Sequence, residues 1–309
     1  MKNTIRIATR KSKLALWQAE FIASCIQKKY PHIKVEFVKI TTTGDKILDV
    51  PLAKVGGKGL FVKEIEEALL TDQADIAVHS MKDVPTYLPE GLKIGIIPKR
   101  EKNTDLFLSQ NFKDLASLPR GARVGTSSLR RQAQLLRLYP HLEIISLRGN
   151  LDTRIKKLCQ GDFQAIVVAT AGVKRLGLKT KYMQELGPPQ FFPAVAQGAL
   201  GLEYLKTRSD LDQLLTFLDD CQTRYEVLAE RAFLTRLEGG CQVPIGAYAT
   251  FKEKEILLHG MVADLSGKIM LKDKLQGPYQ EAEKLGVQLA EKILDQGARE
   301  ILQEVYAQN

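Results

Sequence analysis

The chain has 309 residues, 44% of them hydrophobic and 26% charged, which is the composition of an ordinary globular protein. Its length exceeds what one hydrophobic core usually supports, so we expect two or three domains, and no apolar run approaches the roughly 18–20 residues that cross a bilayer. The formal net charge of +9 indicates acidic partners, although a merely basic surface explains the sum as well.

The first predicted unit alternates strands with helices. A short strand at Thr4–Ala8 precedes a helix at about Lys13–Lys29, which Ser12 is placed to cap. After these come a strand at Lys34–Thr41, a polar and glycine-rich connection at Thr42–Leu60, a helix at Phe61–Leu70, and strands at Asp75–His79 and Gly91–Ile97. Because strand and helix alternate, we predict a parallel α/β sheet.

A second α/β unit begins after the polar stretch 98–103. We predict strands near Asp105–Leu108, Arg123–Gly125, Glu143–Leu147 and Gln164–Ala169, with helices at Leu129–Leu138 and Leu151–Cys159 between them. The following segment, Ala194–Leu218, is too short for a domain, so we expect it to rejoin the first unit. The chain would then cross twice between the units, an arrangement that permits hinge closure over a ligand.

A third unit, of α+β type with an antiparallel sheet covered by helices, completes the chain. We predict a helix at Thr223–Leu237, strands at Val243–Thr250, Glu255–Ala263 and Lys268–Leu275, and a long amphipathic helix with Ala282, Leu285, Leu289 and Ile293 in register. The predicted domains are therefore domain 1 (residues 1–98 and 194–218, discontinuous), domain 2 (residues 103–190) and domain 3 (residues 222–309).

The cysteines and histidines form no metal-ligand or disulfide pattern. The cysteines include no CxxC pair and the histidines have no ligand spacing; the residues are Cys25, Cys159, Cys221, Cys241, His32, His79, His141 and His259. This argues against a disulfide framework and a structural zinc site, so we predict that no metal is bound. The N-terminal residues resemble a strand without a signal-peptide core, so we expect a cytoplasmic location.

Cations stand at the starts of four predicted helices, where the helix dipole makes a positive charge unfavourable by about 0.3–1 kcal/mol unless an anion is present. The four stretches are Thr9-Arg-Lys-Ser-Lys13, Gly57-Lys-Gly59, Gly125-Thr-Ser-Ser-Leu-Arg-Arg131 and Leu147-Arg-Gly-Asn-Leu-Asp-Thr-Arg154, the last with Asn150 as predicted cap. One solvated arginine would mean little. Four such turns at strand ends of two α/β units predict an interdomain cleft for a ligand with several negative charges.

The glycine-rich stretch Gly56-Gly-Lys-Gly59 does not match a nucleotide-binding loop. The Walker pattern requires a glycine where this chain has Leu52, and a serine or threonine where it has Gly59. No GxGxxG signature follows a predicted strand either. Nucleotide binding at this stretch is therefore not predicted.

Asp83 is the acidic candidate, because it lies just past a predicted strand on a turn set by Pro85. It either pairs with the adjacent Lys82, or it stays ionised in a cationic cleft and stabilises a developing cation. His79 lies inside an apolar strand, and we interpret it as a hydrogen-bonded core histidine rather than a catalyst.

Cys241 lies in the turn Gly239-Gly-Cys-Gln-Val-Pro244, after a predicted helix and before a predicted strand. The glycines permit backbone angles that other residues resist, and the proline prevents the helix from continuing. A thiol on such a turn can be a nucleophile, a metal ligand, a covalent anchor, or only a small buried side chain.

Eight short stretches contain most of these candidate residues. They are Ile7-Ala-Thr-Arg-Lys-Ser12, Gly44-Asp-Lys-Ile-Leu-Asp49, Gly56-Gly-Lys-Gly-Leu-Phe61, His79-Ser-Met-Lys-Asp-Val-Pro85, Val124-Gly-Thr-Ser-Ser-Leu-Arg-Arg131, Leu147-Arg-Gly-Asn150 with Thr153-Arg154, Gln197-Gly-Ala199 and Leu237-Glu-Gly-Gly-Cys-Gln-Val-Pro-Ile-Gly246. In this order, and over nearly the whole chain, they resemble the porphobilinogen deaminase family. Ala196 departs from the family's pattern, because many members have glycine there.

The resemblance implies a three-domain fold, with two α/β domains like type II periplasmic binding proteins and a C-terminal α+β domain with an antiparallel sheet. It implies a transferase that joins four porphobilinogen units head to tail, releasing ammonia, to give the linear tetrapyrrole hydroxymethylbilane of heme biosynthesis. It also implies a dipyrromethane cofactor, made from the substrate and held by a thioether on Cys241, which would prime the growing oligopyrrole chain. The family further suggests a monomer.

The resemblance also carries residue roles over to matched positions. It implies that Asp83 is catalytic, holding pyrrole N–H groups and stabilising the cation formed as ammonia leaves. For cofactor binding it implies Cys241, Lys82, Asp83, Thr126, Ser127, Ser128, Arg130, Arg131, Arg148, Lys58 and Gly172. For substrate binding it implies Arg10, Ser12, Gln18, Lys54, Arg148 and Arg154. Each pyrrole ring carries an acetate and a propionate, which arginine can bind through two parallel hydrogen bonds.

Two other functions fit part of the sequence. A non-catalytic, two-lobed binding protein for an acidic small molecule would explain the cationic helix starts, but not the third unit or its Gly-Gly-Cys turn. A nucleic-acid binder would explain the charge, but it would need aromatic platforms among its basic residues, where this chain has hydroxyls and glycines. We therefore expect neither nucleic acid nor membrane as a partner.

Overall fold

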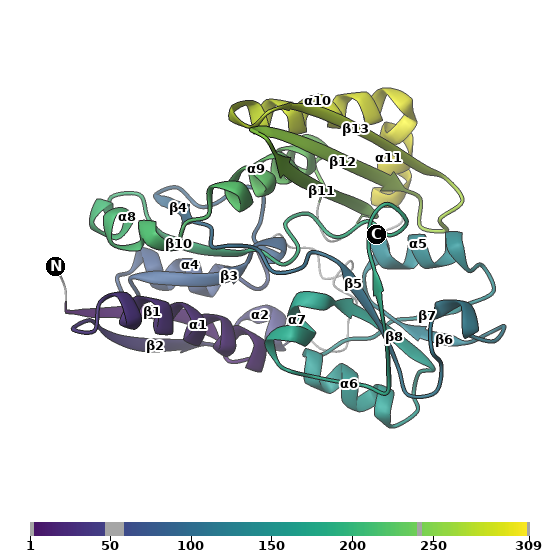
Figure 1. Ribbon diagram of the computed structural model, residues 1–309, viewed down its shortest axis with the longest axis horizontal. Helices are drawn as coiled ribbons and strands as arrows, with labels where there is room; N and C mark the ends of the chain where they lie inside the picture. The colour runs from purple at the N-terminus through teal and green to yellow at the C-terminus, as the bar shows by residue number, and fades with distance from the viewer. Residues whose placement is uncertain (1–2, 47–58, 240–242, 308–309) are drawn as a thin grey trace. The chain divides into compact units, whose positions relative to one another are not determined.

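Figure 1 shows a computed structural model of the chain, which describes residues 3–46, 59–239 and 243–307. The chain folds into two compact units. Unit 1 comprises Met1–Leu48, Gly57–Glu101 and Ala199–Arg224, and unit 2 comprises Asp49–Gly56, Lys102–Gly198 and Tyr225–Asn309. The described residues form one sheet in unit 1 and two sheets in unit 2. The finer division into three domains with the boundaries given above stays a prediction.

The sheet of unit 1 has five strands in the order β2-β1-β3-β10-β4. They are β1 (Thr4–Arg10), β2 (Lys34–Ile40), β3 (Ile76–Ser80), β4 (Leu92–Ile96) and β10 (Leu200–Leu205). β1 is parallel to β2 and β3, but β10 is antiparallel to both of its neighbours, β3 and β4. The four strands for which a parallel sheet was predicted run in the same direction, but the returning strand β10 lies antiparallel between β3 and β4. The chain enters β10 opposite Ser80, at the carboxyl end of β3, and runs back from there.

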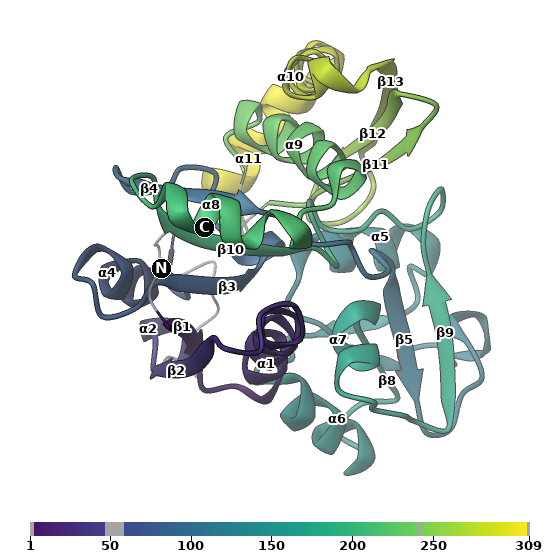
Figure 2. The ribbon, with the colours of Figure 1, turned by 60° about the vertical axis from the view of Figure 1, so that its left-hand side comes forward.

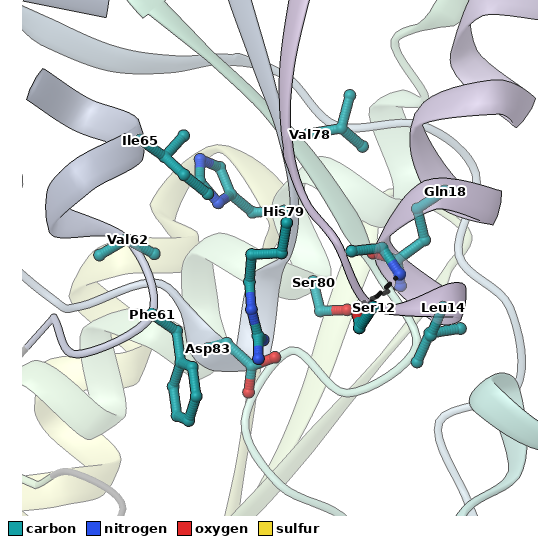
Figure 3. Close-up of a pocket in the computed structure, with 12 residues that line it drawn as sticks. Ser12, Leu14, Gln18, Phe61, Val62, Ile65, Val78, His79, Ser80 and Asp83 are labelled. Atoms are coloured by element: carbon teal, nitrogen blue, oxygen red, sulfur yellow. Dashed lines mark hydrogen bonds between the residues drawn. The ribbon is translucent and has the colours of Figure 1, made fainter. Parts of the chain in front are cut away.

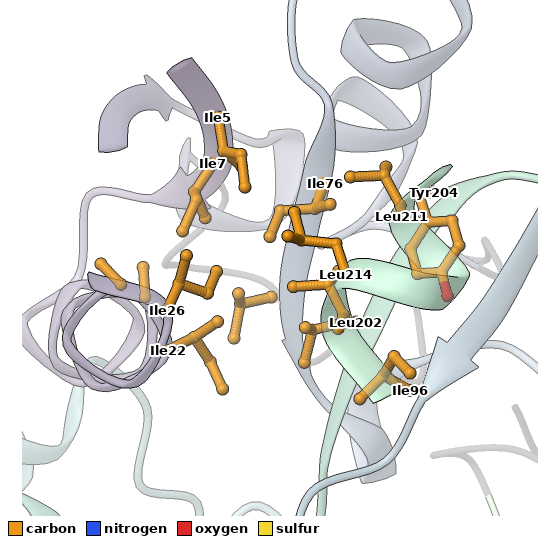
Figure 4. Packing of buried hydrophobic residues seen from close by; sticks show 14 of the residues in the cluster. Ile5, Ile7, Ile22, Ile26, Ile76, Ile96, Leu202, Tyr204, Leu211 and Leu214 are labelled. Carbon is orange, nitrogen blue, oxygen red and sulfur yellow. The ribbon is translucent and has the colours of Figure 1, made fainter. Parts of the chain in front are cut away.

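Helices cover both faces of this sheet. α1 (Lys13–Lys29) and α8 (Ser209–Leu215) pack on one face, and α4 (Lys63–Leu70) packs on the other. Successive strand residues point to opposite faces, so Ile7 joins the α1 and α8 side chains while Ala8 joins those of α4. Figure 4 shows the first cluster, in which burial of each Ile or Leu contributes about 1.5–3 kcal/mol. The short elements of unit 1 are α2 (Thr43–Lys46), η1 (Met81–Asp83) and η3 (Thr216–Leu218).

The first sheet of unit 2 has the order β7-β6-β8-β5-β9 and the same pattern of directions. Its strands are β5 (Asp105–Ser109), β6 (Arg123–Gly125), β7 (Glu143–Ile145), β8 (Ala165–Ala169) and β9 (Tyr182–Leu186). β6 is parallel to β7 and β8, whereas β5 is antiparallel to β8 and β9. Sequence analysis did not predict β9, which is a mostly solvent-accessible edge strand.

Helices also cover both faces of this second α/β sheet. α5 (Leu129–Leu138) packs on one face together with the short turn η2 (Leu115–Ser117), and α6 (Leu151–Cys159) and α7 (Thr170–Arg175) pack on the other. The alternation that divides the faces runs along β8, because Val167 joins the α5 cluster whereas Ile166 and Val168 join the α6 and α7 cluster.

The remaining sheet of unit 2 is antiparallel, with β12 in the middle. Its strands are β11 (Ile245–Lys252), β12 (Glu255–Ala263) and β13 (Met270–Pro278). Its helices are α9 (Cys221–Arg236), which belongs to unit 2 from Tyr225 onward, α10 (Ala282–Ile293) and α11 (Arg299–Ala307), with η4 at Tyr279–Glu281. A Cβ at Gly260 would lie 2.6 Å from Phe233 of α9 and 3.2 Å from Ile293 of α10, so glycine permits this close helix packing. Figure 2 shows these helices beside the sheet.

The end of the chain corrects one prediction. The long amphipathic helix is two helices, α10 and α11, separated by a π-helical turn at Leu294–Ala298. Gly297 in that turn has φ 107°, a left-handed conformation that ends α10 and that glycine adopts readily. The predicted fold class, two α/β sheets followed by an antiparallel α+β portion, is confirmed. Within the described ranges, every helix is too short or too polar to cross a membrane.

Candidate functional site

A pocket in unit 1 lies at the carboxyl ends of β1 and β3, the edge at which open α/β sheets bind ligands (Figure 3). β1 ends at Arg10, and η1 places Asp83 directly after β3. The polar side chains that line the pocket belong to Arg10, Ser12, Gln18, His79, Ser80 and Asp83. The structure therefore brings four of the predicted site residues, Arg10, Ser12, Gln18 and Asp83, together within one unit.

The start of α1 is tied to the end of β3 beside this pocket. Ser12 is the N-cap of α1, as predicted, and its Oγ accepts a hydrogen bond from the backbone N–H of Ala15 at 3.3 Å. Gln18 is 3% exposed and donates from Nε2 to Oγ of Ser80 at 2.8 Å, a bond that Figure 3 shows. These two bonds hold hydroxyl and amide groups in fixed places along the pocket wall.

Asp83 presents its side chain to the pocket from an exposed position. Within the described ranges its carboxylate accepts no hydrogen bond. Figure 3 shows Asp83 and the ring of Phe61 at the same end of the pocket. The carboxylate is therefore available to an N–H donor or a positive charge on a ligand.

Arg10 already has a carboxylate partner within unit 1. Its Nε donates to Oδ2 of Asp45 at 3.2 Å and its Nη2 donates to Oδ1, while its guanidinium carbon lies 4.3 Å from the centre of the Phe61 ring. Burial raises the pKa of Asp45, but the hydrogen bonds and charge of Arg10, with help from Thr42, outweigh burial and lower it. The substrate-binding role of Arg10 stays a prediction, and sequence analysis missed Asp45 as its partner.

Two helix starts of unit 2 lie together at the carboxyl ends of β6 and β7. Ser128 is the N-cap of α5, and its Oγ accepts from the backbone N–H of Arg131 at 3.5 Å. Ser127 donates from Oγ to the carbonyl oxygen of Leu147 at 2.6 Å, which joins the loop after β6 to the loop after β7. The buried Thr126 accepts from the backbone N–H of Ser128 at 3.2 Å.

The loop after β7 contributes Arg148 beside these hydroxyls, and the following helix α6 contributes Arg154. Arg154 donates from Nε to the carbonyl oxygen of Gly149 at 2.8 Å. Asn150 occupies the N-cap position of α6, as predicted, but its side chain makes no capping hydrogen bond. Nη1 of Arg148 is buried and has no hydrogen-bond partner among the residues that the structure describes. A buried cationic N–H without an acceptor is costly, so this atom indicates a place for an anionic ligand.

Arg130 and Arg131 are not free at the surface of α5. Both are buried, at 4% and 6% exposure, and both pair with the fully buried Asp105 at 2.7 Å. Burial raises the pKa of Asp105, but the two guanidinium groups outweigh burial and hold that pKa far below its usual range. Arg131 also donates to the carbonyl oxygen of Val167 at 3.1 Å. Their cofactor-binding role stays a prediction, and sequence analysis did not foresee their structural role under the helix.

The other predicted residues are less informative. Gly172 is buried inside α7, and Lys82 is half-buried in η1. Lys54, Lys58 and Cys241 lie outside the described residues, as does most of the predicted glycine-rich connection. The predicted cleft between the first two domains also stays a prediction.

His79 is a hydrogen-bonded core histidine, as interpreted from the sequence, but it also lines the pocket. Its Nε2 lies 2.8 Å from Oε2 of Glu203 on β10. Sequence analysis missed Glu203 because the two residues are 124 positions apart and no local pattern connects them. The one available signal was a glutamate within the otherwise apolar strand Leu200–Leu205.

The fold and the site define an α/β protein with hydroxyl groups and arginines at its strand ends and an additional antiparallel α+β portion. Two family models match this chain: "Porphobilinogen deaminase, dipyromethane cofactor binding domain" over residues 5–213, and "Porphobilinogen deaminase, C-terminal domain" over residues 224–295. The chain belongs to the porphobilinogen deaminase family, which confirms the resemblance. Cys241 falls within the range that the second model matches.

Curated relatives agree over almost their whole length. The porphobilinogen deaminase of Maridesulfovibrio salexigens is 58% identical over 302 residues, covering 98% of this chain and 98% of that protein. Those of Nitratidesulfovibrio vulgaris and Geotalea uraniireducens are 57% and 51% identical, covering 97% and 98% of this chain and 96% and 95% of those proteins.

Solved structures that resemble the chain include the periplasmic aliphatic sulphonate binding protein SsuA from Escherichia coli and the methionine-binding protein MetQ. The first is 17% identical, covers 77% of this chain and 71% of that chain, and has a TM-score of 0.39. The second is 14% identical, covers 72% of this chain and 90% of that chain, and has a TM-score of 0.44.

Proposed function

We propose that this protein is a transferase that joins four porphobilinogen molecules head to tail, with release of ammonia, to give the linear tetrapyrrole hydroxymethylbilane. The observation that carries this proposal is the Asp83 carboxylate, which lies at the carboxyl end of β3, lines the pocket and accepts no hydrogen bond from the described residues. Family membership supplies the substrate, and the pocket supplies a group suited to its chemistry.

Asp83 is the proposed catalytic residue. Its carboxylate would accept hydrogen bonds from pyrrole N–H groups and would stabilise the positive charge that develops on the substrate as ammonia leaves. An ionised carboxylate can do this without acting as a strong base, since the pyrrole α-carbon is itself the nucleophile. Ser12, Gln18 and Arg10 line the same pocket and are the proposed contacts of the substrate carboxylates.

A dipyrromethane cofactor, which when bound supplies the pyrrole end from which the product chain grows, fits the residues of unit 2. The buried Nη1 of Arg148 has no partner in the described part of the chain, and a carboxylate is the acceptor that a guanidinium binds best. Thr126, Ser127 and Ser128 offer hydroxyl and backbone groups at the adjacent start of α5.

The remaining assignments rest on the family alone. We propose that Cys241 holds the dipyrromethane through a thioether, that Lys58, Lys82, Arg130, Arg131 and Gly172 complete its site, and that Lys54 and Arg154 bind the growing oligopyrrole chain. The family also suggests a cytoplasmic monomer that binds neither nucleic acid nor membrane, and these points stay predictions.

The test is turnover of porphobilinogen by the purified protein. We expect consumption of porphobilinogen, release of one ammonia for each porphobilinogen consumed, and a linear tetrapyrrole as the product detected by mass spectrometry. Binding of porphobilinogen without ammonia release would contradict the proposal and would favour the non-catalytic, two-lobed binding protein.

A further inference from the structure

Three ionisable side chains come together inside unit 1 next to the pocket, and the proposed function gives none of them a role. Nε2 of His79 on β3 lies 2.8 Å from Oε2 of Glu203 on the adjacent strand β10, and the two side chains are 4% and 1% exposed. Oε1 of Glu203 is buried and has no hydrogen-bond partner among the described residues. Glu66 of α4, which packs on the same sheet, is 7% exposed.

The three side chains share one electrostatic environment. The pKa of Glu66 is raised to about 7. Burial is the largest cause, the negative charge of Glu203 adds to the rise, and His79 opposes it. It is costly for both buried carboxylates to be negatively charged with only one imidazole between them, so Glu66 keeps its proton until neutral pH. The cluster therefore gains one negative charge, by loss of a proton to solvent, as pH rises through about 7.

The cluster borders the pocket on one side. His79 lines the pocket, and so does Ile65, which precedes Glu66 on α4 (Figure 3). The charged groups around His79 come from four elements: Glu203 from β10 and Glu66 from α4 belong to the cluster, whereas Arg10 from β1 and Asp83 from η1 line the pocket with it. A change in the charge of the cluster is thus felt where Asp83 meets a ligand.

We propose that Glu66, His79 and Glu203 form a buried positioning cluster that supports cation formation in the Asp83 pocket, and that it does so fully only when Glu66 is ionised. This inference rests on the proposed function. His79 presents its ring to the pocket, Glu203 holds that ring through Nε2, and Glu66 sets the net charge behind it. The cluster touches no reacting atom and acts through the field that it adds to that of Asp83.

The size of the effect follows from Coulomb's law. One unit charge about 10 Å from a developing cation, in an effective dielectric constant of about 20, changes a rate on the order of tenfold. We therefore expect kcat/KM to rise by about this factor as pH increases through the titration of Glu66 near 7. A purely structural role predicts no such rise of kcat/KM, because ionisation of a buried carboxyl group weakens the fold.

The experiment compares Glu66→Gln with Glu67→Gln in the cofactor-loaded enzyme. Glutamine has the shape of protonated glutamate but does not titrate, and Glu67 is the exposed neighbour of Glu66 on the same helix. Between about pH 6 and 9, kcat/KM of the wild type and of Glu67→Gln should rise with pH. For Glu66→Gln, kcat/KM should not rise and should stay at the value that the wild type has at low pH. The inference would be overturned if kcat/KM of all three proteins rose with pH in the same way.

A second measurement separates failure of the inference from failure of the proposed function. The chain has four histidines, so the ring resonances of His79 can be assigned in NMR spectra by comparison with His79→Gln. In the resting enzyme the pH dependence of these resonances should be the same in the wild type and in Glu67→Gln, and it should change in Glu66→Gln, which removes the titrating charge. This dependence on Glu66 in a protein whose wild type shows no turnover would contradict the proposed function. Turnover with His79 resonances that do not respond to Glu66 would contradict the cluster.

Discussion

Removing the buried acid Glu66 should stabilise unit 1, and more so at high pH than at low pH. The pKa of Glu66 is about 7 in the folded protein against an ordinary value of 4.5, so the folded state holds the proton over a range where the unfolded state has lost it. Between these two values the free energy of unfolding therefore falls as pH rises. Glu66→Gln has no proton to lose and should escape this fall.

The magnitude follows from the size of the shift. A difference of about 2.5 pH units, at about 1.36 kcal/mol per unit, corresponds to about 3 kcal/mol. We expect Glu66→Gln to exceed the wild type in stability by about 3 kcal/mol above roughly pH 8, and by less than about 1 kcal/mol near pH 5. Glu67→Gln, at the exposed neighbouring position, should change stability by no more than about 0.5 kcal/mol at either pH.

The assay can follow unit 1 by itself. The single tryptophan of the chain, Trp17, lies in α1, so its fluorescence during urea unfolding reports the unit that contains Glu66. Equal effects of Glu66→Gln at low and high pH would refute the reasoning, because the titration would then not differ between folded and unfolded states. A less stable Glu66→Gln at high pH would refute it more strongly, since it would mean that the ionised carboxylate stabilises the fold.

Three further predictions concern single side chains. Asp105→Asn should cost about 3–5 kcal/mol in the unfolding of unit 2, because it leaves two buried guanidinium groups without their carboxylate; a loss below about 1 kcal/mol by circular dichroism would contradict this. Glu185→Gln, which breaks a partly exposed pair with Lys102 in the same unit, is the matched control and should cost under about 1 kcal/mol. Ser128→Ala should cost about 1 kcal/mol through loss of the α5 cap, whereas an unchanged urea midpoint would mean that the cap contributes nothing. Asp83→Asn should keep the cofactor in the intact mass but lose most ammonia release, and rates equal to wild type would remove Asp83 from the mechanism.

Local features of the fold were predictable from the sequence because their causes are local. Ser12 caps α1 in the structure, as predicted, and it stands at the start of a segment whose apolar residues recur with helical period. Asp83 was placed just past a strand by its position after an apolar run, and the structure has it there. The direction of β10 was not predictable, because it depends on where the chain re-enters the sheet rather than on its own residues.

Long-range side-chain partners were the part that the sequence did not reveal. Arg130 and Arg131 have the same pattern as an anion-binding helix start, yet both point to Asp105, 25 and 26 residues earlier in the chain. Glu203 is paired with His79 because β10 lies beside β3, and this neighbour relation exists only after folding. Ala196 shows a further limit: its φ of 56° explains why glycine suits that position, but alanine itself gives no sign of it.

The most direct test of the account is the intact mass of the purified protein, measured for the wild type and for Cys241→Ala. The account predicts that the wild type is heavier than its sequence by one dipyrromethane and that Cys241→Ala has the mass of its bare sequence. Cys159→Ala, which changes an exposed cysteine outside the site, should keep the extra mass. An active wild type with the unmodified sequence mass, or a Cys241→Ala variant that still carries dipyrromethane, would contradict the proposal that Cys241 holds the cofactor.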